Sequence, residues 1–141
     1  MVTGVHHINF LVRDLDAARE RFSSLGLKFE SPVTLPARGV VTSRARLGNV
    51  WLVLVQPQSM DSLPGRRLAA QGEGIFLVSF EVDDLDSAVA AIGENGGRVS
   101  GDPRHGLDDW QVIDLDPTAF CGAALQLCVE TSRTVAGASG V

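Results

Sequence analysis

The sequence has few cysteines, no long apolar run and no concentration of positive charge, and each absence excludes a class of protein. Cys121 and Cys128 are its only cysteines, too few for a disulfide scaffold or a zinc-finger ligand set, so we expect reduced thiols in a cytoplasmic protein. No stretch approaches the about 18 consecutive apolar residues of a membrane span. Lysine and arginine number 12 against 17 acidic residues, with no basic stripe, which disfavours a nucleic-acid partner.

What the chain does contain is enough apolar sequence for one compact domain. Hydrophobic residues make up 45% of the 141 residues, which is ample for a core. The first residues lack the basic patch and apolar run of a secretory signal, in keeping with the expected cytoplasmic location. The segment 131–141 (TSRTVAGASGV) is small and polar, and we expect it to be disordered.

One stretch of the sequence recurs after seventy residues. GVHHINFLVRDLDAA matches GIFLVSFEVDDLDSA, so that Asp14 aligns with Asp84 and His7 with Leu77. Two copies at this long period indicate a duplicated supersecondary module rather than a solenoid repeat.

Each copy predicts the order strand, helix, strand, strand, strand. An alternating strand comes first, and Asp14 or Asp84 then stands at the expected helix N-cap, where its side chain can accept from first-turn amides. The helices should end at Gly26 and at Gly96–Gly97, which suit a left-handed C-cap. The later strands are expected at 27–30, 40–47 and 51–55 in the first copy and at 98–100, 110–115 and 123–129 in the second.

These modules predict the α+β class. We expect two tandem βαβββ modules that close into one cup-shaped mixed sheet with the helices outside. The first module spans about residues 4–57 and the second about 74–130, within a single domain at 1–130. Residues 58–73 between them are expected to be a linker that contains one helical turn.

Strand alternation sorts the side chains onto two faces. In the first strand His7 and Asn9 share a mixed face, whereas His6 falls on the opposite side and is expected to be packing or surface. The same parity in the other strands predicts a polar lining that faces a cavity. Its members are His7, Asn9, Thr42, Arg44, Ser79, Asp114 and Gln126.

Several motifs, in this order and spacing, resemble the vicinal oxygen chelate superfamily, which includes glyoxalase I, extradiol dioxygenases and bleomycin-resistance proteins. The motifs are HINFLVRDLDAARERF, LPARGVV, LGNVWLVLVQP, FEVDDLDSAV and VIDLDP. The resemblance covers about residues 4–130 and looks closest to the methylmalonyl-CoA epimerase branch. It implies two βαβββ modules around a buried site that takes a small molecule, and a homodimer, which is common in that superfamily.

The resemblance also implies positions for a divalent metal ion. The ligands of metal-dependent members correspond here to His7, Val53, Leu77 and Gln126. Val53 and Leu77 have no donor atom, and hard divalent ions need several oxygen or nitrogen ligands. We therefore expect no bound metal and no other cofactor. The carboxylates that the epimerase resemblance implies fall at about Thr42 and at Gln126, and neither residue can act as a base near neutral pH.

Three titratable residues of the lining are candidates for catalysis. Arg44 could hold a carboxylate, phosphate or enolate through paired hydrogen bonds, and Asp114 could be a general base, tuned by burial against Arg44. The alternative is that these two pair with each other, or that one faces solvent. His7 is a candidate general acid or base, because a free imidazole titrates near neutral pH; the alternative is a hydrogen-bonded residue that only lines the pocket.

The remaining candidates are expected to bind a ligand. Asn9 and Gln126 would orient it, Trp51 and Trp110 would form walls or belong to the core, and Arg46 would lie at the rim. The full set is Asn9, Thr42, Arg46, Trp51, Val53, Leu77, Ser79, Trp110 and Gln126. The segment GDPRHGLDDW is expected to be a loop before the seventh strand, either a lid or a surface turn. Both thiols are expected to be inert.

Two functions are compatible with these residues. The first is a metal-independent enzyme of the isomerase or lyase type, which acts on a small carbonyl or acyl metabolite through His7, Asp114 and Arg44. The second is a non-catalytic binding or resistance protein of the bleomycin-resistance type, which an apolar pocket with aromatic walls would favour. A metal-dependent methylmalonyl-CoA epimerase is disfavoured by the residues at the ligand positions.

Overall fold

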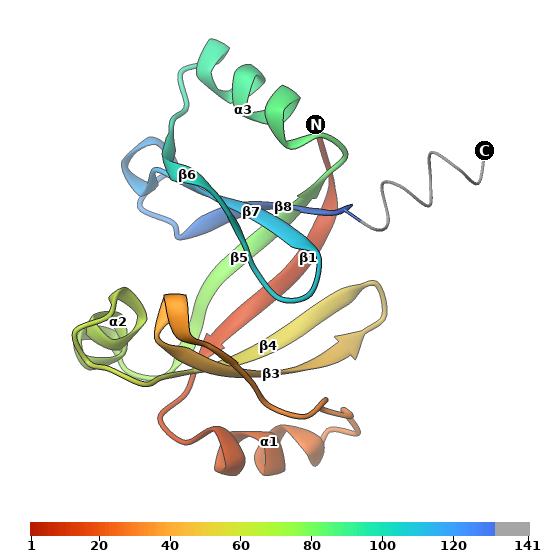
Figure 1. Ribbon diagram of the computed structural model, residues 1–141, viewed down its shortest axis with the longest axis vertical. Helices are drawn as coiled ribbons and strands as arrows, with labels where there is room; N and C mark the ends of the chain where they lie inside the picture. The colour runs from red at the N-terminus through yellow and green to blue at the C-terminus, as the bar shows by residue number, and fades with distance from the viewer. Residues whose placement is uncertain (132–141) are drawn as a thin grey trace. The chain divides into compact units, whose positions relative to one another are not determined.

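The computed structural model describes residues 1–131, and its chain divides into two compact units. The first unit is His7–Phe76. The second unit combines Met1–His6 with the chain from Leu77 onward. Strands β1 (Val2–Leu11) and β5 (Gly74–Val82) contribute residues to both units, and each unit is described below by itself (Figure 1).

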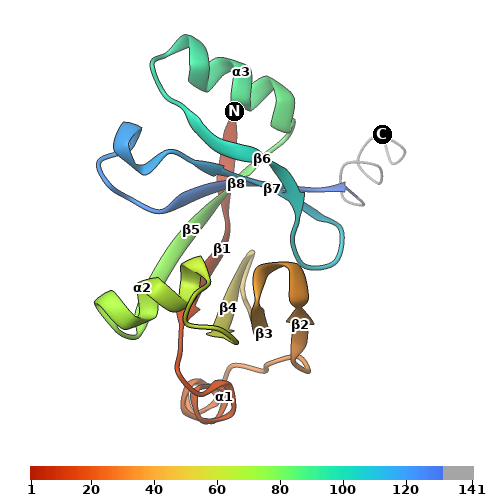
Figure 2. The same cartoon turned by 60° about the vertical axis from the view of Figure 1, so that its left-hand side comes forward.

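The first unit is a four-stranded arrangement with helices beside it. Its sheet runs in the order β2-β3-β4-β1, with β1 parallel to β4 and the other pairs antiparallel. Helix α1 lies along β3 and β4 (Figures 1 and 2), and a cluster around Leu15 and Leu54 fills the space between them. Its elements after β1 are α1 (Leu15–Ser23), β2 (Val33–Leu35), a 3-10 turn (Pro36–Arg38), β3 (Val40–Leu47), β4 (Val50–Pro57) and α2 (Leu63–Gln71).

The second unit repeats this plan. Its sheet runs β5-β8-β7-β6, with β5 parallel to β8 and the remaining pairs antiparallel, and the start of β1 bonds to β5 through Thr3 Oγ1 and the Glu81 carbonyl. Apolar residues of α3, including Leu85 and Ala88, form one core cluster with Leu127 of β8. Its elements after β5 are α3 (Leu85–Glu94), β6 (Val99–His105), β7 (Trp110–Leu115), a 3-10 turn (Pro117–Ala119) and β8 (Leu125–Glu130).

The helix boundaries follow the predicted caps. Asp14 accepts a hydrogen bond from the Ala17 amide at 3.0 Å, and Asp84 accepts one from Ser87 at 3.3 Å, which satisfies amides that have no partner inside the helix. Beyond the helix ends, Gly26 and Gly96 take positive φ angles of 87° and 86°, as a left-handed C-cap requires.

Three predicted elements differ from the structure. The strand expected at 27–30 is reduced to a single bridge from Phe29 to Ala45, and pairing resumes in β2 after Pro32, which has no N–H to donate. The linker at 58–73 contains a nine-residue helix, α2, instead of one turn, because Ser62 caps its amide end and a proline is tolerated in the first turn.

The third difference is at β6. The segment expected to be a loop from Gly101 continues the strand to His105, after a register shift between Ser100 and Arg104. Gly101 has a φ of 80°, and a bulge at such a glycine lets pairing with β7 resume.

The α+β class and the tandem βαβββ order are confirmed. In residues 1–131, no helix combines the length and apolar character needed to cross a membrane. The tail at 132–141 lies outside the described residues, so its expected disorder stays a prediction.

Candidate functional site

A polar row crosses the second unit from β5 to β7. In the strand register, Ser79 lies opposite Gln126, and Gln126 lies opposite Asp114, so the three side chains share one face. Ser79 and Gln126 are buried and Asp114 is half-buried. Gln126 Nε2 donates to Asp114 Oδ1 at 3.2 Å. Three residues expected to line the site therefore lie together.

Arg104 completes this row, and the sequence prediction missed it. Its Nη1 donates to Asp114 Oδ2 at 2.5 Å and its Nη2 to Asp114 Oδ1 at 3.1 Å. The two side chains are 26% and 30% exposed. A planar guanidinium matches a carboxylate in this two-bond geometry, so Arg104 fixes the position of Asp114.

Three buried polar atoms of the row have no hydrogen-bond partner within residues 1–131: Ser79 Oγ, Arg104 Nε and Gln126 Oε1. Arg104 Nε is a donor, Gln126 Oε1 is an acceptor, and a serine hydroxyl can act as either. A buried polar group without a partner costs about 1–3 kcal/mol, and ligands or ordered water satisfy such groups in functional proteins. The row therefore offers a donor, an acceptor and a hydroxyl group to a ligand.

The first unit carries a cationic and aromatic cluster. The Arg44 and Arg46 Cζ atoms lie 4.0 Å and 4.2 Å from the centroid of the Trp51 ring, within the range of cation–π attraction. Arg44 Nε also pairs with Glu30 Oε1 at 3.2 Å. Glu30 was not among the predicted residues. The Trp51 ring therefore contacts two arginine side chains, of which Arg46 is exposed.

The other predicted residues of the first unit fall in rows with this cluster. His7 lies opposite Trp51, and Asn9 lies opposite Val53, which in turn faces Arg44. Asn9 Oδ1 is buried with no hydrogen-bond partner in the described part of the chain. Thr42 instead donates to the Val33 carbonyl at 3.3 Å, which gives it a structural contact inside the sheet.

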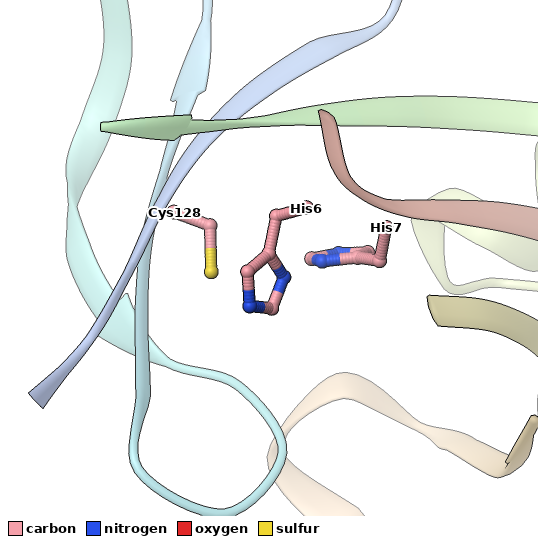
Figure 3. A group of neighbouring side chains, drawn as sticks. All are labelled: His6, His7 and Cys128. Atoms are coloured by element: carbon pink, nitrogen blue, oxygen red, sulfur yellow. The ribbon is translucent and has the colours of Figure 1, made fainter. Parts of the chain in front are cut away.

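A second group of side chains surrounds His6. His6, His7 and Cys128 are all buried, and their potential ligand atoms lie within 4.8 Å of one another (Figure 3). His6 Nε2 bonds to Glu130 Oε1 at 2.6 Å. The His6 ring also meets Trp110 edge-on, with 4.5 Å between ring centroids.

Of the two roles expected for His6, packing or surface, the structure shows packing. The register places Trp110 opposite Glu130 and Asp114 opposite Gln126, so the partners of His6 lie on the face of β7 and β8 that carries the polar row. His6 and the next residue, His7, are both buried.

The chemical state of Cys128 follows from its surroundings. Burial, with the charges of Glu130, Glu81 and Asp109 nearby, raises the pKa of the Cys128 thiol. Cys128 is thus a protonated thiol, in keeping with the inert thiol expected there. Cys121 is exposed, so we no longer expect it to be inert toward thiol reagents.

Comparison with known proteins assigns the chain to a protein superfamily. The model of the Glyoxalase/Bleomycin resistance protein/Dioxygenase superfamily matches residues 6–113. The chain belongs to this superfamily.

The relatives point to one branch of it. An ethylmalonyl-CoA/methylmalonyl-CoA epimerase of Cereibacter sphaeroides is 30% identical over 131 residues, which cover 90% of this chain and 98% of the relative. A variant methylmalonyl-CoA epimerase of Streptomyces coelicolor, solved with 2-nitronate-propionyl-CoA, is 28% identical with a TM-score of 0.87, and the match covers 93% of this chain and 99% of the other. The methylmalonyl-CoA epimerase of Mycobacterium tuberculosis shares the fold at 23% identity, with a TM-score of 0.89 over 96% and 93% of the two chains. The predicted similarity to this branch is confirmed.

Proposed function

We propose that this protein catalyses proton transfer at the carbon next to the carbonyl of an acyl-CoA substrate, without a metal ion at the family's metal position. The observation that carries the proposal is the buried Arg104 Nε, a cationic donor with no acceptor among residues 1–131, held beside Asp114 and Gln126. A donor fixed in this way is suited to the negative charge that develops on an enolate oxygen.

The family's divalent ion does not fit the residues present. Of the positions that the resemblance implies, Val53 and Leu77 are buried at 3% and 7% exposure and have no donor atom. His7 and Gln126 alone are too few for a hard divalent ion. No step of the proposed reaction passes through a metal ion at these positions.

The reaction begins with the transfer of a carbon-bound proton to a basic side chain. The electron pair of the broken C–H bond moves into the carbonyl group and forms an enolate, whose oxygen accepts from Arg104 Nε–H. Return of a proton from the protonated base to the carbon restores the acyl group. Both Asp114 oxygens already accept hydrogen bonds, so Asp114 is a positioning residue for Arg104.

The Arg44–Trp51–Arg46 cluster supports an anionic substrate. Two guanidinium groups on one tryptophan place positive charge on an aromatic surface, and guanidinium groups bind carboxylates and phosphates well. One solved relative is in complex with 2-nitronate-propionyl-CoA, which supports a CoA derivative as the substrate. We therefore assign this cluster to the acidic groups of the substrate.

Exchange of the carbon-bound proton tests this function directly. The protein is incubated with methylmalonyl-CoA in deuterated water with EDTA, and deuterium on the acyl group is followed by mass spectrometry. We expect exchange above the protein-free rate, reduced about 100- to 1,000-fold in kcat by Arg104→Met. Arg98→Ala, an exposed arginine of the same unit, is the control with unchanged exchange. Exchange that occurs without EDTA and is lost with it would contradict a metal-independent reaction.

A binding protein of the bleomycin-resistance type is the second candidate. The ion pairs of Arg44 with Glu30 and of Asp114 with Arg104 favour it, because paired charges can serve structure and binding without turnover. Saturable binding of methylmalonyl-CoA in calorimetry, with no exchange in any variant, would support this candidate. A cytoplasmic homodimer without a nucleic-acid partner remains the expectation for either function.

A further inference from the structure

We propose that Ser79 and Gln126 bind a hydroxyl group on the acyl part of the substrate, which makes the substrate class a 3-hydroxyacyl-CoA. The inference rests on the proposed function for the CoA thioester and adds the group that the acyl chain carries. Ser79 on β5 and Gln126 on β8 are 0% and 4% exposed, and they lie opposite each other in the strand register. The Ser79 Oγ and Gln126 Oε1 atoms have no hydrogen-bond partner within residues 1–131.

The orientation of the Gln126 amide is fixed by Asp114. Gln126 Nε2 donates to Asp114 Oδ1 at 3.2 Å, and the same carboxylate is paired with the Arg104 guanidinium. An ionised carboxylate only accepts hydrogen bonds, so a rotated amide would set two acceptors against each other. Gln126 Oε1 is therefore the atom left for a ligand, and the ligand must supply an O–H or N–H donor.

The charges of the row select a neutral group. A carboxylate on the acyl chain would bring only acceptors to Gln126 Oε1 and would lie beside the negative charge of Asp114. An ammonium group would bring only donors and would lie beside the Arg104 guanidinium. A hydroxyl group both donates and accepts. It can donate to Gln126 Oε1 and accept from the Ser79 hydroxyl, so it satisfies both buried atoms at once.

The strand order indicates which carbon carries the hydroxyl. In the proposed reaction Arg104 Nε binds the enolate oxygen, and the Arg104 side chain reaches from β6 to Asp114 on β7. Ser79 and Gln126 lie on the next two strands of the sheet, β8 and β5, and neighbouring strands are about 4.8 Å apart. A hydroxyl on the reacting carbon would lie against the enolate oxygen itself. A hydroxyl on the following carbon, carbon 3, extends toward β8 and β5.

Three CoA thioesters that differ in one group on carbon 3 test the proposal by calorimetric titration of the full chain. They are 3-hydroxybutyryl-CoA, 3-methylbutyryl-CoA and 3-carboxybutyryl-CoA. We expect the hydroxyl compound to bind about 10-fold or more tightly than the methyl compound, because a methyl group leaves both buried atoms without a partner. We expect the carboxylate compound to bind most weakly of the three.

Variants of the row connect this preference to the two residues. Ser79→Ala should lower the ratio of the two dissociation constants, hydroxyl against methyl, by about 3-fold or more, and Gln126→Met should remove the preference. The matched control is Ser43→Ala. Ser43 is also a buried serine, but its hydroxyl already donates to the Glu30 carbonyl at 2.6 Å, so the ratio should equal that of the wild type.

Each other outcome overturns the hydroxyl site. Equal affinity of the wild type for the hydroxyl and methyl compounds, or tighter binding of the carboxylate compound, would contradict it. A preference that survives in both Ser79→Ala and Gln126→Met would place the hydroxyl elsewhere. Circular dichroism checks that the variants fold; if Ser79→Ala does not, Ser79→Cys replaces it, and its weaker donor should also lower the ratio.

Deuterium exchange at carbon 2 of the same compounds separates this inference from the proposed function. A hydroxyl preference in binding without exchange would keep the hydroxyl site and contradict the proton-transfer reaction. Exchange without a hydroxyl preference would keep the reaction and contradict the hydroxyl site.

Discussion

Arg104 on β6 and Asp114 on β7 are joined by two hydrogen bonds, of 2.5 Å and 3.1 Å. Each side chain is about a quarter to a third exposed, so the pair is neither a screened surface ion pair nor a fully desolvated one. Gln126 adds a third bond to the same carboxylate at 3.2 Å. The pair therefore anchors the polar row of the second unit, and its removal should be felt both in stability and in the site.

Replacing Arg104 by alanine should lower the free energy of unfolding by about 1–2 kcal/mol, a value between those of exposed and buried pairs. Arg104→Lys should recover less than half of this loss, because an ammonium group cannot form the paired bonds of a guanidinium. Urea denaturation of the variants measures both effects.

The matched control is Arg98→Ala. Arg98 also pairs with an aspartate, Asp116, but its side chain is 67% exposed, so solvent screens the pair. We expect a clearly smaller loss than for Arg104→Ala. Equal losses would show that the geometry of the Arg104 pair adds nothing beyond an ordinary surface charge.

The sequence predicts those parts of this site that lie on strands with unbroken alternation. β3 at 40–47 and β7 at 110–115 have the predicted bounds, because their alternation is unbroken, and Asp114 was found through β7. Arg104 was missed because a glycine and a proline precede it in GDPRHGLDDW. These residues indicate a loop locally, while hydrogen bonds from β7 extend the strand past them. In the register after the bulge, Arg104 lies opposite Val112, two residues before Asp114 on the same face of β7.

The His6 group was missed for a different reason. Alternation assigns consecutive residues to opposite faces, so His6 was placed opposite His7 and expected to be packing or surface. In the structure both His6 and His7 are buried, and the partner of His6, Glu130, is 124 residues away in sequence. A contact of this kind depends on the tertiary arrangement of the second unit, which no local pattern records.

The two N-caps should contribute unequally to stability. Asp14→Ala should lower the free energy of unfolding by about 1 kcal/mol, and Asp84→Ala by less, because its bond to the capped amide is longer, at 3.3 Å against 3.0 Å. Asp14→Asn and Asp84→Asn, which keep the acceptor, should be close to wild type. Thermal unfolding followed by circular dichroism compares them. Asp16→Ala, in the first turn of α1 but not at its cap, is the control, and a loss there as large as at Asp14 would contradict the capping role.

The two cysteines should differ sharply in reactivity in the EDTA-treated protein. Cys128 is fully buried, and burial raises the pKa of its thiol above the ordinary value of 9.0. Going from neutral pH to about 9 therefore produces little thiolate at Cys128, and the thiolate is the reactive form. We expect one fast-reacting thiol per chain with a thiol reagent in native conditions and two in urea. Cys121→Ser should abolish the fast phase; a fast phase that survives this substitution would show that Cys128 is accessible.

Two glycines should respond in opposite directions to substitution by alanine. At Gly65, in the first turn of α2, an added Cβ would lie 2.1 Å from the Ser59 carbonyl oxygen and 2.7 Å from Met60 Cα. Both are backbone atoms, so the chain before α2 must move, and we expect Gly65→Ala to lower the free energy of unfolding by about 2 kcal/mol or more.

At Gly93, in the last turn of α3, no atom outside the helix backbone and the neighbouring residues lies within 4 Å of the added Cβ. There alanine gains helix propensity, and Gly93→Ala should raise the free energy of unfolding by about 0.5–1 kcal/mol. Urea denaturation of both variants decides the matter, and a loss of stability at Gly93 equal to that at Gly65 would rule out the close approach of Ser59 as the cause.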